Sequence, residues 1–132
     1  MKKLTLCSIL LGTLLLTSCA TYQPILNIKQ EPVTQTLSQK QVEKAILMGG
    51  LQKGWTMKVT QPGLIRGTIT VRTHQATIDV PYTDKDFSIQ YVSSVGLNDN
   101  GKGTIHRNYN KWITLLDQAI RIELTGAVTI PS

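Results

Sequence analysis

Four stretches in the middle of the chain alternate between apolar and polar residues, which is the pattern of β-strands with one buried face. The turns between them, residues 61–63, 72–75 and 83–86, have lengths that keep all apolar positions on one side of an antiparallel meander. These apolar positions are Trp55, Met57 and Val59, then Ile65, Gly67, Ile69 and Val71, then Ala76, Ile78, Val80 and Tyr82, and finally Phe87, Ile89 and Tyr91.

One helix is predicted before these strands and one after them. Ser38-Gln39-Lys40-Gln41 fits a capping box at the start of the first helix, and Gly54 is a natural stop. The second helix begins at His106 or Asn108, of which Asn108 is the better N-cap residue, and ends at Gly126. The apolar faces consist of Val42, Ala45, Ile46 and Gly49, and of Tyr109, Trp112, Ile113, Leu116 and Ile120. We predict an α+β fold, α-β-β-β-β-α, with two helices packed on one face of a four-stranded antiparallel meander.

The polar positions of the same strands form the opposite face of the predicted sheet. They include three basic residues, Lys58, Arg66 and Arg72, interleaved with threonines and with Asp79. Antiparallel sheets commonly expose one face to water, and Thr is frequent in strands for conformational reasons. This face is therefore either simply solvated or a binding surface for an anionic glycan, a lipid headgroup or an acidic protein.

The first 18 residues have the features of a bacterial export signal. Lys2 and Lys3 supply the positive start, and residues 4–16 are an apolar run that is too short to span a bilayer. Leu16-Thr17-Ser18-Cys19 resembles the lipobox of bacterial lipoproteins, which implies cleavage before Cys19 and acylation of its sulfur and its new amine. Three acyl chains are ample for stable attachment to a membrane, because two anchoring signals already suffice.

The residues after the lipobox indicate where the protein is sorted and how its domain is held. Ala20 rather than Asp follows the cysteine, which by resemblance to lipoprotein sorting implies the outer membrane, with the domain facing the periplasm. Residues 19–37 contain two prolines and no sustained period, so we predict a tether after the lipidated cysteine. Residues 38–132 then form a single periplasmic α+β domain.

The composition limits the chemistry that the mature protein can perform. Cys7 lies in the signal and Cys19 takes the lipid, so no thiol is left for a disulfide or a nucleophile. Loss of Lys2 and Lys3 reduces the 14 basic residues to 12, against 8 acidic residues, for a formal net charge of +4. This excess is too small to indicate a nucleic-acid partner. The chain contains no hydrolase or metalloprotease signature, so we predict a protein that is not an enzyme and has no cofactor.

Further candidate binding residues lie around the start of the second helix. Lys102 belongs to a loop rich in Gly and Asn, and His106 and Arg107 follow it. The meander brings the turn that contains His74 to the same end of the sheet. His74, His106 and Asp99 are therefore an alternative site for a small ligand or a divalent metal. Their spacing matches no specific metal motif, and a helix start explains the same residues, so the main expectation is no metal.

Several features occur together across residues 19–124: the lipobox, the capped helix before Gly54-Trp55, the hairpin at Pro62-Gly63 and the pattern Ile105-His106-x-x-Tyr109-Asn110-x-Trp112. Together they resemble a family of small, uncharacterised proteobacterial lipoproteins. The resemblance implies the location and the architecture but no activity. Our first hypothesis is a non-enzymatic binding module of the cell envelope that contacts an envelope protein or an anionic polymer. The alternatives are a small-ligand or metal-binding lipoprotein and a hydrolase of envelope components.

Overall fold

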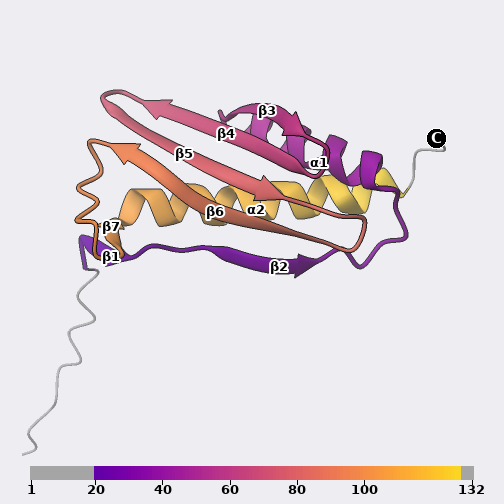
Figure 1. The fold of residues 1–132 in the computed structure, drawn as a ribbon, viewed down its shortest axis with the longest axis horizontal. Helices are drawn as coiled ribbons and strands as arrows, with labels where there is room; N and C mark the ends of the chain where they lie inside the picture. Colours follow the sequence, from indigo (N-terminus) through magenta and orange to yellow (C-terminus); the bar gives the residue numbers. More distant parts are fainter. Residues whose placement is uncertain (1–19, 129–132) are drawn as a thin grey trace, which may run out of the picture.

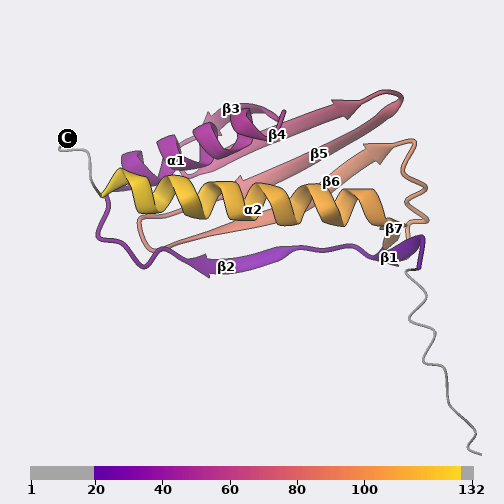
Figure 2. The same ribbon diagram turned by 180° about the vertical axis from the view of Figure 1, so that it is seen from behind.

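Two helices lie on one face of an open antiparallel sheet, and no helix covers the other face in the part of the chain that the structure describes (Figures 1 and 2). The computed structural model describes residues 20–128. The large sheet has five strands in the order β2-β6-β5-β4-β3, and a two-stranded sheet, β1-β7, lies at one end. The elements are β1 (Tyr22–Pro24), β2 (Ile28–Pro32), α1 (Gln39–Gln52), β3 (Thr56–Gln61), β4 (Leu64–Val71), β5 (His74–Pro81), β6 (Asp86–Val95), β7 (Thr104–His106) and α2 (Arg107–Ala127). The predicted α+β class with an antiparallel sheet is confirmed.

The strands β3 to β6 are hydrogen-bonded to one another in chain order. Arg66 lies opposite Lys58 on one side and Asp79 on the other, and Asp79 lies opposite Gln90. These four polar residues form one row on the face without helices, which we call the bare face. Two of the three turns are tighter than predicted. Only residues 72–73 join β4 to β5, and a φ of +58° at Arg72 makes this two-residue turn feasible.

Residues 20–37, which we predicted to be part of a tether, belong to the fold. β1 pairs with β7, and β2 pairs with β6 as an edge strand of the large sheet. Val33 and Leu37, which follow β2, are buried in the core. The prediction failed because β2 is short and irregular: its register shifts around Gln30, which has a positive φ, and the alternation of apolar residues is lost. The predicted count of four strands is wrong for the same reason.

The core lies between the sheet and the two helices. α1 begins at the predicted capping box, because Ser38 Oγ accepts a hydrogen bond from the Gln41 backbone N–H and Gln41 Oε1 accepts one from the Ser38 backbone N–H. The helices approach closely at Gly49, where an added Cβ would lie 2.9 Å from the backbone nitrogen of Ile120. The largest fully buried side chains come from both layers and include Ile46, Ile65, Ile78, Phe87, Ile89, Tyr109, Ile113, Leu116 and Ile120.

The predicted signal peptide, residues 1–18, and the predicted lipidation site, Cys19, lie outside the described residues. Between residues 20 and 128, none of the helices has both the length and the apolar character that a membrane span requires. β1 begins at Tyr22, so the folded part of the chain starts three residues after the predicted anchor.

Candidate functional site

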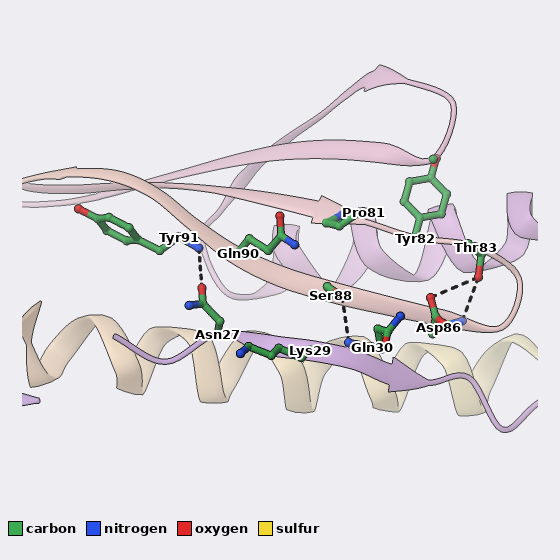
Figure 3. Close-up of a pocket in the computed structure, with 11 residues that line it drawn as sticks. Asn27, Lys29, Gln30, Pro81, Tyr82, Thr83, Asp86, Ser88, Gln90 and Tyr91 are labelled. Carbon is green, nitrogen blue, oxygen red and sulfur yellow. Dashed lines mark hydrogen bonds between the residues drawn. The ribbon is translucent and has the colours of Figure 1, made fainter. Parts of the chain in front are cut away.

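The bare face of the sheet carries a hollow of about 870 Å³ across β2, β6 and β5 (Figure 3). Its lining contains no His or Cys. The polar groups come mainly from the edge strand and from its neighbour β6, and Pro81 and Tyr82 form a less polar side. The polar residues that line the hollow include Asn27, Lys29, Gln30, Ser88 and Gln90.

Two side chains hold the irregular edge strand against β6 and shape the hollow. Ser88 Oγ accepts the backbone N–H of Gln30 at 2.9 Å, and Asn27 Oδ1 accepts the backbone N–H of Tyr91 at 2.9 Å (Figure 3). Gln30 has a φ of +47°, so its backbone departs from regular strand geometry at this point. Side-chain bonds therefore replace part of the ladder at the irregularity, as is common where a bulge redirects side chains.

The hollow presents polar groups that are free to meet a ligand. The side chains of Lys29, Gln30 and Gln90 make no hydrogen bond or ion pair with any part of the chain from residue 20 to 128. One ammonium and two carboxamides can donate and accept hydrogen bonds along a polar ligand. Asp86 is instead tied into the β5–β6 turn, where its backbone N–H bonds to Thr83 Oγ1 at 3.1 Å. The arrangement suits reversible binding of a ligand rich in hydroxyl or amide groups.

The three basic residues predicted on the bare face do not act together. Arg66 makes a bidentate ion pair with Asp79, with N–O distances of 2.9 and 3.0 Å, and this pairing raises the pKa of Arg66. Lys58 lies opposite Arg66 on β3, but Arg72 lies in the β4–β5 turn at one end of the sheet. In this row Lys58 is the one cation without a partner among the described residues, and a single uncompensated charge weakens the case for a strongly anionic ligand there.

The structure brings His74, His106 and Asp99 to one end of the sheet but does not arrange them around a metal (Figure 1). In the described part of the chain, no three His, Cys, Asp or Glu side chains are grouped so that they could hold a metal ion. Asp99 Oδ2 instead accepts the hydroxyl of Tyr91 at 2.9 Å. His106 also has a structural role, since its ring packs edge-on against Tyr22 with the ring centroids 6.2 Å apart.

The N-cap of α2 is His106, and the preference for Asn108 is wrong. His106 Nδ1 accepts the backbone N–H of Asn108 at 3.2 Å. The physical reason is that β7 pairs with β1 as far as His106, which lies opposite Tyr22, and the chain turns directly from this strand into the helix. The last strand residue is therefore the capping residue.

A second group of basic residues surrounds the start of α2. Lys102 lies in the loop between β6 and β7, and Arg107 and Lys111 lie one turn apart on α2. Arg72 lies in the β4–β5 turn at the same end of the molecule (Figure 1). Lys111 was missed in the sequence, although its spacing of four residues from Arg107 places both on one side of the helix.

The hollow was also missed in the sequence. Lys29 and Gln30 lie in the segment taken for a tether, and Gln90 looked like any other polar residue of a solvated strand. Only the pairing of β2 with β6 brings them together. No local sequence pattern predicts a contact between segments that lie so far apart in the chain.

Comparisons with known proteins do not assign the chain to a family: it matches no protein-family model, no curated protein and no solved structure. Function is therefore inferred from two surfaces of the molecule. These are the polar hollow on the bare face and the basic end around the start of α2.

Proposed function

We propose that the chain is a lipid-anchored binding module of the bacterial cell envelope, without enzymatic activity. It is held at the outer membrane through acylated Cys19, faces the periplasm and binds its partner on the bare face of the sheet. In this proposal the α-β-β-β-β-α core, with both helices on one face, is the scaffold that leaves the opposite face accessible. The observation that supports this proposal most directly is the polar hollow of about 870 Å³ on that face.

The chemistry of the hollow favours a polar polymer of the envelope, such as a glycan strand, as the ligand. Gln30 and Gln90 offer carboxamides, which pair with hydroxyl and amide groups, and Lys29 offers one ammonium. The flat side of Pro81 suits the apolar face of a sugar ring. No observation favours the alternative ligand or metal site at His74 and His106, because no three possible ligand side chains are grouped for a metal within residues 20–128, and His106 caps α2.

Site-specific photo-crosslinking in intact cells tests this proposal. A photoreactive amino acid replaces Gln90 in the hollow and, as a matched control, the exposed Gln118 on α2. We expect an adduct from position 90 only, and its mass and its sensitivity to glycan-cleaving enzymes or to proteases identify the partner. Equal adducts at both positions, or none at position 90, would overturn the assignment of the hollow.

A separate experiment tests the anchor. Wild-type protein should incorporate a labelled fatty acid and sediment with the outer membrane. The Cys19→Ala variant should lose the label and leave the outer-membrane fraction, because neither acylation of Cys19 nor cleavage at the lipobox can occur. A variant that keeps the label, or that remains in the outer membrane without it, contradicts the proposed anchoring through Cys19.

A further inference from the structure

The folded part of the chain begins so close to Cys19 that the lipid leaves no room for a spacer. The backbone N–H of Arg107 donates to the carbonyl oxygen of Thr21 at 2.9 Å, and Tyr22 pairs with His106. Two residues of chain reach at most about 7 Å. An acylated Cys19 therefore keeps the β1–β7 end of the domain within a few ångströms of the membrane surface.

The same end carries four exposed basic side chains: Arg72, Lys102, Arg107 and Lys111. None of the four makes a side-chain hydrogen bond or an ion pair within residues 20–128. They come from three separate segments, the β4–β5 turn, the β6–β7 loop and the first two turns of α2, which all lie at one end of the molecule (Figures 1 and 2). The charges therefore form a surface and not a run along one strand or helix.

Acidic residues are distributed in the opposite way. Asp99 is the one acidic residue at the β1–β7 end of the described chain, and it accepts a hydrogen bond from Tyr91. Glu31, Glu43, Asp84 and Asp86 lie around the β5–β6 turn at the other end and on the elements beside it.

At that other end, basic residues are also paired. Arg121 lies 3.0 Å from Glu31 and 2.8 Å from Asp117, and Lys40 lies 3.0 Å from Glu43. Four unpaired basic side chains therefore share the end next to the predicted lipid, whereas the other unpaired lysines of the described chain are spread over the rest of the molecule: Lys29 on β2, Lys44 on α1, Lys53 at its C-cap and Lys58 on β3. Lys44 and Lys53 lie outside this group, so they are useful controls.

We infer that the β1–β7 end rests on the membrane and binds anionic phospholipid headgroups through Arg72, Lys102, Arg107 and Lys111. This inference rests on the proposed lipidation of Cys19, because the lipid brings these residues to the surface. Attraction to an anionic surface decays over a Debye length, about 8 Å at physiological ionic strength, so only charges held this close to the membrane act strongly.

The consequence is an oriented domain and not stronger attachment, since three acyl chains already hold the protein on the membrane. The long strands of the sheet run away from the anchored end toward the β5–β6 turn (Figure 1). A domain that stands on its β1–β7 end projects the bare face and its hollow into the periplasm. A domain that lay flat on either face would cover the hollow or press α2 against the lipid.

The test uses the full lipidated protein in vesicles of phosphatidylcholine, with or without phosphatidylglycerol at about one part in four. Cys19 is blocked by its lipid, so a single introduced cysteine gives a unique site for a fluorophore. One label replaces Asn108 beside the basic residues, and the other replaces Thr34 in the β2–α1 loop at the opposite end. Lipids with a quencher on the headgroup then report how close each label lies to the surface.

We expect strong quenching at position 108 and little at position 34 on anionic vesicles at physiological salt. The double variant Arg107→Gln/Lys111→Gln should reduce the quenching at position 108 to its level on neutral vesicles. The matched variant Lys44→Gln/Lys53→Gln, which removes the same charge from α1, should leave it unchanged. Equal quenching at both labels, equal quenching on both types of vesicle, or an equal loss in the two double variants overturns the inference.

Failure of the anchor itself gives a different result in the same experiment. If Cys19 carries no lipid, the protein does not float with the vesicles in a density gradient, whatever its variant. If the protein floats and the label at position 108 is not preferentially quenched, the anchor stands and the headgroup contact does not.

Discussion

The two faces of the large sheet are built from the same strands, and they differ in almost every other respect. On the helix-covered face, Ile65, Ile78 and Phe87 are fully buried beneath α1 and α2. On the bare face, the row that contains Arg66 and Gln90 is exposed, and part of it borders a polar hollow. Stability is therefore concentrated on one face, because apolar burial dominates folding, and the other face is left free to change with a partner.

The largest effect on stability is expected from a truncation on the covered side. Ile113 on α2 is fully buried, and Ile113→Ala should lower the free energy of unfolding by about 2–5 kcal/mol through lost burial and a residual cavity. Urea unfolding followed by circular dichroism measures it. Thr68→Ala in the sheet is the control and should change stability by less than about 0.5 kcal/mol. Similar losses of unfolding free energy in the two variants would show that stability is not concentrated on the helix-covered face.

Close helix packing gives the next largest effect. Gly49→Ala places a Cβ 2.9 Å from the backbone nitrogen of Ile120, so the helices must separate. We expect a loss of about 1–3 kcal/mol, although Ala is intrinsically the better helix residue. Gly126→Ala in α2 is the matched control, because nothing lies within 4 Å of its added Cβ. That variant should gain up to about 1 kcal/mol, and opposite signs in the urea midpoints would confirm the close contact.

The strands were predictable because the covered and bare faces impose a strict alternation on β3 to β6. The cap of α1 was predictable because the capping box is a local motif, and its hydrogen bonds form between Ser38 and Gln41. β2 was not predictable, since its register breaks at Gln30 and its partners, β6 and Arg121 of α2, are far away in the sequence. Local sequence patterns thus predicted the elements in which apolar residues recur at a regular spacing. They failed for β2, whose structure depends on partners that are distant in the sequence.

The candidate sites follow the same rule. Lys102 and Arg107 could be selected from the sequence because they flank a helix start, but their proximity to Arg72 depends on the topology of the sheet. The hollow depends on the bond between Ser88 and the backbone of Gln30, which no local motif encodes. The strength of the Arg66–Asp79 pair also required the strand register, which places the two residues opposite each other.

A smaller, pH-dependent effect is expected from a polar contact on the covered side. The hydroxyl of Tyr82 donates to Glu43 of α1, and this bond, followed by one from Lys40, lowers the pKa of Glu43 below its usual 4.5. A lowered folded-state pKa stabilises the protein above the unfolded value, and the contribution is lost as the pH falls through the folded value. Glu43→Gln should therefore cost about 1 kcal/mol at neutral pH and less in acid.

Urea unfolding between neutral pH and pH 3 measures this effect, and Tyr82→Phe is the matched variant because it removes the other partner of the same bond. The two substitutions should be non-additive when combined, because Tyr82→Phe removes the donor of the bond, and Glu43→Gln removes the charge of its acceptor while keeping an acceptor oxygen. Burial, together with the same bond, raises the pKa of Tyr82 to about 12, so the tyrosine contributes stability that is lost only at strongly alkaline pH. Fully additive losses would show that the contact does not couple α1 to the sheet.

The smallest effect on stability is expected from the polar pair of the bare face, and it sharpens the comparison most. Asp79→Asn removes the ion pair with Arg66, but Arg66 is half exposed and Asp79 is only partly buried, so the variant should lower the free energy of unfolding by less than about 1 kcal/mol. The variant also frees the charge of Arg66 in the row that contains Gln90. If the partner is a neutral polar polymer, crosslinking from position 90 should be unchanged, whereas an anionic partner should crosslink more strongly. A stable variant with altered crosslinking would thus assign the charge of the ligand, because on this face binding can change while folding does not.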